Sequence, residues 1–235
     1  MMVAAVLASA LGIGVLANRQ DDVSRPDAAR IVASPVPTTP PPAPSVSPTP
    51  SVSPGPNPRV RAAQQRLIDL GYWLPAATGF LDDHTLHAAT ALQKVAGLAR
   101  TGVLDDATKA ALREGVLPEP RSTQGRVVEI DRARQILTIA IDGKPHTVFD
   151  TSTGKPSTPT VGGTFSVFKQ IDALRVSRLG RLWRPKYFYG GQAIHGFTSV
   201  PPYAASHGCV RLTYAAMNHV WDTDLIPVGT AVWIS

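Results

Sequence analysis

The stretch that decides the fold class runs from Gln124 to Phe149 and reads QGRVVEIDRARQILTIAIDGKPHTVF. Apolar and polar residues alternate along much of it, as is typical of β-strands. Asp142-Gly143 interrupts the pattern and is the strongest short signal for a hairpin turn. The pattern therefore predicts consecutive strands over 127–130, 136–141 and 146–149.

Further strands are predicted downstream, at Thr164–Phe168, around Val176 and at Val232–Ile234. Only Thr213–Asp222 has the spacing of a helix of any length. A chain of roughly 110 residues is long enough to enclose one hydrophobic core. We therefore expect residues 124–235 to form a compact, mainly β domain with one or two small helices.

Upstream, between residues 59 and 117, apolar residues recur instead at steps of three and four. This spacing predicts helices over 60–70, 85–95 and 108–112, which are separated by turns that contain glycine. The two halves of the region share one layout, a glycine turn, a threonine and then a helix. We expect a small all-α three-helix module, which makes the whole chain α+β.

The N-terminal segment has a different composition. Residues 1–20 begin with an apolar run, MMVAAVLASALGIGVLA, which is predicted to be a signal peptide or a membrane anchor. Residues 21–58 are predicted to be a disordered linker rich in Pro, Ser and Thr, because eleven of the 22 prolines lie in Pro35–Pro58. Export and a linker of this kind indicate an extracytoplasmic protein.

The charge and the cysteine count restrict the partners. The formal net charge is +6, which suits a polyanionic neighbour such as nucleic acid, anionic lipid or cell wall. The basic residues are scattered and match no nucleic-acid-binding motif, so we predict no nucleic-acid partner. The chain has one cysteine, so it can form no intrachain disulfide.

The residues that carry the chemistry lie in two short segments, Ile194–Phe197 (IHGF) and Ser206–Leu212 (SHGCVRL). A cysteine nucleophile needs a base that removes the thiol proton, and histidine does this best near neutral pH. His195 lies 14 residues before Cys209 and could face it from a neighbouring strand. His207 lies two residues before it, on the same face of an extended segment. The residues alone leave both histidines as candidates.

Gly208 precedes the cysteine and lacks a Cβ, so a substrate carbonyl can approach the main chain closely. The N–H groups of Gly208 and Cys209 are natural donors to an oxyanion. Two other interpretations weigh against catalysis: Cys209 could be an inert buried thiol, or it could bind zinc together with His195 and His207. The zinc site would lack a fourth ligand, so we predict no metal.

The remaining histidines and aromatic residues are interpreted as structural. Four histidines have no visible partner and are predicted at the surface or in turns, namely His84, His87, His146 and His219. Four aromatic residues are predicted in the core or in the walls of a cleft, namely Trp183, Tyr187, Tyr189 and Tyr203.

The predicted β domain resembles the L,D-transpeptidase catalytic domain, the family often called YkuD-like. The resemblance spans roughly residues 124–235 and implies that this domain is a β-sandwich. It rests on His195-Gly196 and Ser206-His207-Gly208-Cys209-Val210-Arg211, with Ser152–Lys155, Thr158–Thr160, Gly162–Phe165, Ile226-Pro227 and Gly229–Val232 in matching order. Residues 59–117 resemble the three-helix peptidoglycan-binding module. That match rests on Leu67, Leu70–Tyr72, Thr78–Phe80, Thr85, Ala89, Leu92-Gln93, Gly97-Leu98, Thr101-Gly102, Thr108 and Leu112.

The resemblance implies a role for each motif residue. Cys209 is the nucleophile, His195 is the general base, and the Gly196 carbonyl orients the imidazole. The amides of Gly208 and Cys209 form the oxyanion site. Four side chains are implied in substrate binding, namely Arg211, His207, Ser206 and Tyr203.

The implied reaction joins the third residues of two peptidoglycan stem peptides through a cysteine thioester, without a cofactor. The alternatives are an L,D-carboxypeptidase, with water as acceptor, and a non-catalytic wall-anchoring protein. We expect a monomer whose partners are stem peptides and wall polymer, with a membrane tether if residues 1–20 are retained. The helical module is expected to act as a separable tether to the polymer, so that deletion of residues 59–115 weakens retention on insoluble wall material and spares turnover of soluble fragments.

Overall fold

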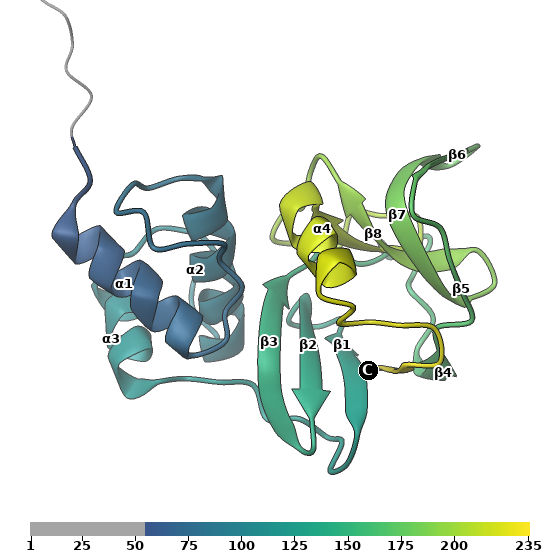
Figure 1. Cartoon of the computed structure of the whole chain (residues 1–235), viewed down its shortest axis with the longest axis horizontal. Coiled ribbons are helices and arrows are strands. Elements are labelled where there is room, and N and C mark those ends of the chain that lie inside the picture. Colours follow the sequence, from purple (N-terminus) through teal and green to yellow (C-terminus); the bar gives the residue numbers. More distant parts are fainter. Residues whose placement is uncertain (1–54) are drawn as a thin grey trace, which may run out of the picture. The chain divides into compact units, whose positions relative to one another are not determined.

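Residues 55–235, the part of the chain that the computed structural model describes, contain four helices and two β-sheets (Figure 1). The first helices are α1 (Pro58–Asp69), α2 (Asp83–Ala96) and α3 (Asp106–Glu114). The signal or anchor predicted at 1–20, and most of the linker predicted at 21–58, lie outside the described residues. None of the helices described is both long enough and apolar enough to span a membrane.

Two buried glutamines explain why the helical module, as we call α1–α3 with their loops, has two similar halves. Gln64 of α1 and Gln93 of α2 are fully buried. Each side-chain amide accepts from the glycine N–H of the next turn and donates to the threonine near the start of the next helix. These partners are Gly79 and Thr85 for Gln64, and Gly102 and Thr108 for Gln93. The repeated glycine and threonine of the sequence are thus hydrogen-bonding positions.

The predicted helices begin earlier than their apolar spacing indicated. Asp82 caps α2 by accepting from the N–H of Thr85, and Asp105 caps α3 by accepting from the N–H of Thr108. An N-cap aspartate satisfies an N–H that has no partner within the helix, so both helices start directly after their aspartates.

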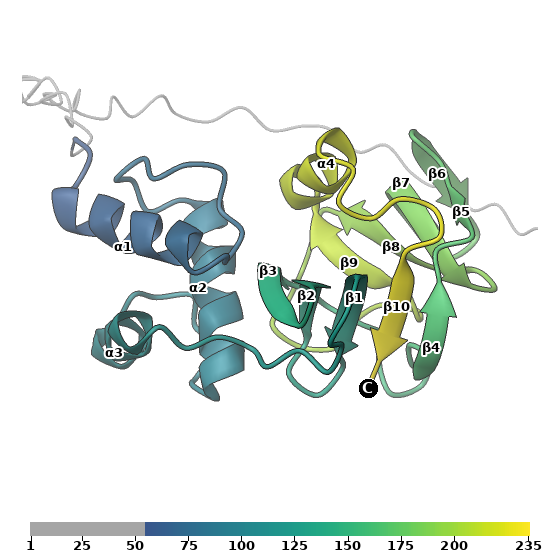
Figure 2. The ribbon, with the colours of Figure 1, turned by 60° about the horizontal axis from the view of Figure 1, so that its bottom comes forward.

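The second region, which we call the β domain, contains two five-stranded sheets and one helix (Figure 2). The first sheet has the order β3-β2-β1-β10-β4, with β1 Arg126–Asp131, β2 Ile136–Ile141, β3 Lys144–Asp150, β4 Gly163–Ser166 and β10 Ala231–Ile234. The second has the order β5-β7-β8-β9, with β6 paired to β7. The strands of this second sheet are β5 Lys169–Gln170, β6 Leu174–Ser177, β7 Gly180–Tyr189, β8 Gln192–Phe197 and β9 Val210–Thr213. The predicted α+β class is confirmed.

The core of the β domain contains side chains from both sheets and from helix α4 (Tyr214–Asp222). The buried members include Val128, Leu137, Ile139, Phe149 and Val232 from the first sheet, Phe188, Ile194, Val210 and Leu212 from the second, and Met217 and Val220 from α4. Each such side chain contributes about 1.5–3 kcal/mol when it is removed from water. This shared core fixes the second sheet, which carries the motif residues, against the first.

The helical module packs directly on β3. The backbone of Val148 accepts from the N–H of Trp73 at 2.9 Å and donates to the carbonyl of Gly71 at 2.8 Å. Val148 also belongs to the apolar core of the helical module, and Trp73 packs against the core of the β domain. The two cores therefore exchange side chains across the junction.

A buried ion pair crosses the same junction. Lys94 of α2 is 1% exposed, and its ammonium donates to the carboxylate of Asp150. It also donates to the carbonyls of Gln135 and Thr151, both at 2.9 Å, so all three N–H groups are used. The second carboxylate oxygen of Asp150 lies 2.6 Å from Nδ1 of His87. His87, which was predicted as a surface or turn residue, therefore lies in α2 and pairs with a buried carboxylate.

Candidate active site

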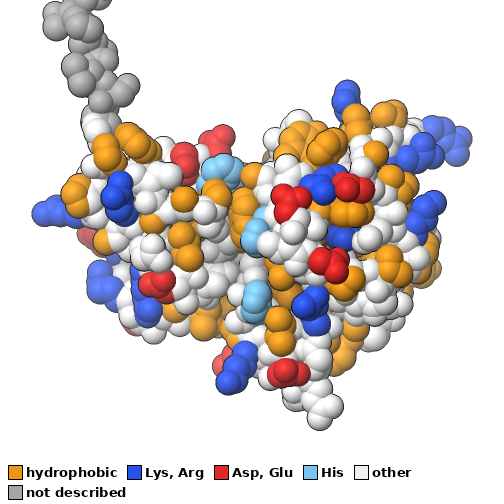
Figure 3. All heavy atoms as spheres, in the orientation of Figure 1, with side chains coloured by type: hydrophobic (Ala, Val, Ile, Leu, Met, Phe, Trp, Pro, Cys, Tyr) orange, Lys and Arg blue, Asp and Glu red, His pale blue; other side chains and the backbone are white. Residues whose placement is uncertain are grey.

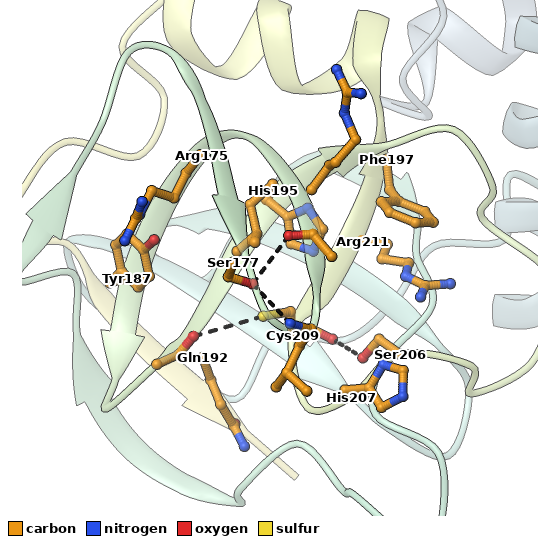
Figure 4. A pocket seen from close by; sticks show the side chains of 15 residues that line it. Arg175, Ser177, Tyr187, Gln192, His195, Phe197, Ser206, His207, Cys209 and Arg211 are labelled. Carbon is orange, nitrogen blue, oxygen red and sulfur yellow. Dashed lines mark hydrogen bonds between the residues drawn. The ribbon is translucent and has the colours of Figure 1, made fainter.

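Parallel pairing of β8 with β9 brings the two motif segments together. His195 of β8 lies in register with Arg211 of β9, and Cys209 directly precedes β9. Cys209 and His195 line one pocket of about 340 Å³ together with Ser206, His207 and Arg211 (Figure 4). The parallel pairing of β8 with β9 therefore brings His195 and Cys209 into one pocket, although they are 14 residues apart in the sequence.

His195 is held in one tautomer. Its Nδ1 lies 2.9 Å from the carbonyl oxygen of Gly196, and because a carbonyl only accepts, Nδ1 carries the proton. Burial lowers the pKa of His195 to about 4, with a further lowering by Arg211 and an opposing effect of the Gly196 carbonyl. The ring is therefore neutral near pH 7, and its Nε2 is free to accept a proton.

The thiol of Cys209 is protonated in the same environment. Burial raises the pKa of the Cys209 thiol, although the Ala193 N–H and the charge of Arg211 act in the opposite direction. The sulfur lies 3.8 Å from the carbonyl oxygen of Gly191. If this thiol is to act as a nucleophile, a neutral imidazole in the same pocket would have to take its proton during the attack.

Ser206 organises the loop that carries the cysteine. Its hydroxyl donates to the carbonyl of Cys209 at 2.5 Å and accepts from the N–H of Gly208 at 3.1 Å. The Gly208 N–H, which the resemblance implied as an oxyanion donor, is therefore already bonded. The N–H of Cys209 donates to none of the acceptors in residues 55–235 and is available to a ligand.

Gly208 has no room for a side chain. Its φ is +110°, and an added Cβ would lie 2.7 Å from the side-chain nitrogen of Gln192. Gln192 is itself fixed, because its amide accepts from the Val161 N–H and donates to the Pro159 carbonyl. The glycine before Cys209 is thus required by both conformation and packing.

Arg211 presents a cation to the pocket. Its guanidinium lies 4.1 Å from the ring centroid of Phe197, and no carboxylate of the described residues lies within ion-pair distance of it. Its backbone carbonyl accepts from the hydroxyl of Thr151 at 2.6 Å and from the N–H of Ser152 at 3.3 Å. The guanidinium is therefore free to pair with an anionic ligand.

The other two residues implied in substrate binding lie further out. His207 is exposed at the rim, with Nε2 3.4 Å from the ammonium of Lys155. Tyr203 is 63% exposed and does not line the pocket, and its carbonyl accepts from the hydroxyl of Ser152. Within residues 55–235 no group of three or more His, Cys, Asp or Glu side chains is placed to hold a metal ion.

The opposite wall of the Cys209 pocket was not predicted from the sequence. It comes mainly from the β6–β7 hairpin, which contributes Arg175, Ser177 and Arg181, while Tyr187 also lines the pocket, beside Arg175 in Figure 4. One signal existed: RVSRLGRLWR at 175–184 contains four arginines at steps of three. Of the other aromatic residues predicted in core or cleft, Trp183 donates to Asn218 beside the core, and Tyr189 packs on Phe165.

Comparison with known proteins identifies both regions. Residues 125–234 match the L,D-transpeptidase catalytic domain (YkuD) family, and residues 56–112 match the peptidoglycan binding domain family. No curated protein matches the chain. Among solved structures, an L,D-transpeptidase (residues 123–326) from Xylanimonas cellulosilytica DSM 15894 is 44% identical, with a TM-score of 0.75, over 77% of this chain and 95% of that one.

Two further solved structures are more distant. An L,D-transpeptidase from Stackebrandtia nassauensis is 21% identical, with a TM-score of 0.48, over 78% of this chain and 97% of that one. An L,D-transpeptidase from Mycobacterium smegmatis is 22% identical, with a TM-score of 0.41, over 47% of this chain and 58% of that one. The 44% identity over almost the whole of the Xylanimonas chain shows to which family this chain belongs. The chain belongs to the L,D-transpeptidase family.

Proposed function

We propose that this protein cross-links peptidoglycan stem peptides by acyl transfer, with Cys209 as nucleophile and His195 as general base. The observation that carries the proposal is the fixed tautomer of His195, whose Nδ1 is bonded to Gly196 so that Nε2 is left to accept a proton in the pocket of Cys209. The matched catalytic family provides the reaction class.

In the first half-reaction, Nε2 of His195 takes the thiol proton as the sulfur attacks the carbonyl carbon of the third stem residue. The negative charge that develops on the carbonyl oxygen is met by the free N–H of Cys209. The peptide bond to the terminal D-alanine then breaks, and His195 returns the proton to the departing amine. A thioester on Cys209 remains.

In the second half-reaction, a side-chain amine of another stem attacks the thioester. His195 accepts the proton from that amine, the bond to sulfur breaks, and the thiol is regenerated. The cationic side chains of Arg175, Arg181 and Arg211 around the pocket support binding of an anionic peptide. Because both matched families act on cell-wall material, we infer an extracytoplasmic location.

The proposal is tested by the intact mass of the protein after incubation with a carbapenem or a tetrapeptide stem. The wild-type protein should gain one acyl adduct, and Cys209→Ala should gain none. If the folded wild-type protein acquires no adduct from either reagent, it is not an acylating enzyme and the wall-anchoring alternative is favoured. A cross-linked dimer of stems, rather than a shortened stem, separates transpeptidation from carboxypeptidation.

The pH dependence of acylation should reveal the burial of His195. Attack requires the neutral ring, so the second-order rate of carbapenem acylation should fall on acidification only as the imidazole becomes protonated. Because burial lowers the pKa of His195 to about 4, the acid limb should have its midpoint near pH 4. His207→Ala is the control and should give the same profile. A midpoint close to the usual histidine value of about 6.5 would contradict the prediction.

A further inference from the structure

A second pocket lies between the helical module and α4. It has a volume of about 560 Å³ and shares no lining residue with the pocket of Cys209. Figure 3 shows histidine side chains gathered along the hollow between these two parts of the molecule. We call this pocket the junction groove and define it by six of its lining residues: Trp73, His84, His146, Asn218, His219 and Asp222.

Trp73 forms an aromatic platform in the junction groove. Its ring packs against the core residue Phe149, with centroids 6.0 Å apart and planes at 29°. The imidazoles of His84 and His219 flank it, with centroids at 5.8 and 5.9 Å. These contacts hold the indole in place before any ligand arrives, so little side-chain entropy remains to be lost on binding.

The junction groove contains hydrogen-bond donors that have no acceptor among the described residues. The indole N–H groups of Trp183 and Trp221 are both hydrogen-bonded, whereas that of Trp73 donates to no acceptor within residues 55–235. The amide oxygen of Asn218 accepts from Trp183 and Arg184, while its NH₂ group has no acceptor among the described residues. A pocket that combines an aromatic surface with a few fixed polar groups is typical of a small-molecule or polymer site.

The charge of the junction groove differs from that of the Cys209 pocket. Its one carboxylate, Asp222, pairs with Arg184 at 3.1 Å, and burial lowers the pKa of His219, which favours a neutral ring. The Cys209 pocket instead has three arginines and, among its described lining residues, no carboxylate. An anionic peptide is therefore attracted to the Cys209 pocket, and an uncharged ligand suits the junction groove.

We propose that the junction groove binds the uncharged glycan strand of the wall polymer, with a sugar ring against Trp73 and its hydroxyl or acetamido groups on the surrounding imidazoles and amides. This proposal rests on the proposed function, since it supposes that the same polymer supplies stems to Cys209. It assigns polymer binding to a surface that the helical module and α4 build together, not to the helical module alone.

The Lys94–Asp150 ion pair supports this assignment, because it fixes the two walls of the junction groove relative to one another. One face of α4 lines the groove at Asn218 and His219, and its other face packs into the core at Met217 and Val220. A glycan strand in the groove would therefore be held on the same compact unit as Cys209, which raises the local concentration of stems.

The test uses a tetramer of N-acetylglucosamine as a soluble glycan probe, titrated into the full chain carrying Cys209→Ala so that no turnover occurs. Binding is followed by two-dimensional NMR. We expect His84→Ala/His219→Ala, and separately Trp73→Phe, to weaken binding by at least about tenfold. Leu86→Ala is the matched control, because Leu86 is exposed on α2 outside the groove and its loss should leave the affinity unchanged.

Unchanged affinity in both groove variants would overturn the proposal, as would displacement of the probe by a soluble tetrapeptide stem, which would assign the groove to peptide. Carbapenem acylation of the same variants with Cys209 intact separates this result from the proposed function. Normal acylation with unchanged glycan affinity refutes only the groove. Loss of acylation in the wild-type protein, with groove-dependent glycan binding, refutes only the catalytic proposal.

Discussion

Lys94→Met should lower the free energy of unfolding by about 3–5 kcal/mol, because removal of one partner of a buried ion pair leaves the other charge uncompensated. The ammonium of Lys94 is the hydrogen-bond donor to Asp150 and to the buried carbonyls of Gln135 and Thr151. Methionine fills a similar volume and donates nothing, so these three acceptors lose their partner. Urea denaturation of the whole chain measures the change.

The matched control is the same substitution at Lys109, whose ion pair with Asp106 on α3 is exposed to solvent. Exposed pairs contribute little, so Lys109→Met should leave the urea midpoint unchanged. The double variant Lys94→Met/Asp150→Leu should recover part of the lost stability, because it also removes the buried carboxylate that has lost its ammonium partner. A midpoint for Lys94→Met equal to that of Lys109→Met would show that the junction does not depend on the ion pair.

The contacts between the helical module and the β domain also change the expected result of deleting the module. Deletion of residues 59–115 would remove Lys94 and His87 from Asp150, and would uncover Val148 and Phe149, on which Tyr72 and Trp73 pack. Such a protein is expected to lose turnover of soluble fragments as well as retention on the wall. We therefore predict that the helical module does not act as the separable tether that its sequence indicated.

Local signals explain what was predictable in the fold. The Asp142-Gly143 turn and the helices were visible because capping, turn chemistry and apolar spacing act within a few residues. The strands β7 and β8 were not identified. Their ladder shifts register between Trp183 and Lys186 and again between Tyr187 and Tyr189, so the alternation of apolar and polar residues is broken.

Contacts between distant residues could not be predicted from such signals. Strands β1 and β10 pair in parallel, with Val127 opposite Ala231, across most of the β domain. Lys94 and Asp150 are 56 residues apart, and each taken alone is typical of a solvated surface. In the active site the motifs identified Cys209 and two histidines. The difference in burial between His195 and His207 emerged only from the sheet.

His195→Ala should slow carbapenem acylation by about 10²–10⁴-fold, the usual contribution of a positioned general base. The reason is geometric: with Nδ1 bonded to the Gly196 carbonyl, Nε2 of this ring is the acceptor that the thiol of Cys209 requires. His207→Ala should slow the same reaction far less, because this ring is exposed at the rim of the pocket and its Nε2 faces the ammonium of Lys155. Stopped-flow or mass-resolved acylation kinetics give both rates.

A structural role of His195 must be separated from a chemical one, and His195→Gln does this. The glutamine amide can still donate to the Gly196 carbonyl, but it cannot accept a proton at neutral pH. If His195 is the base, glutamine acylates as slowly as alanine, and added imidazole accelerates the alanine variant more than the wild-type protein. If glutamine restores the rate, the ring only supports the loop. If His207→Ala is the slow variant instead, proton transfer runs through the exposed ring beside Lys155, and the burial of His195 is a property of the core.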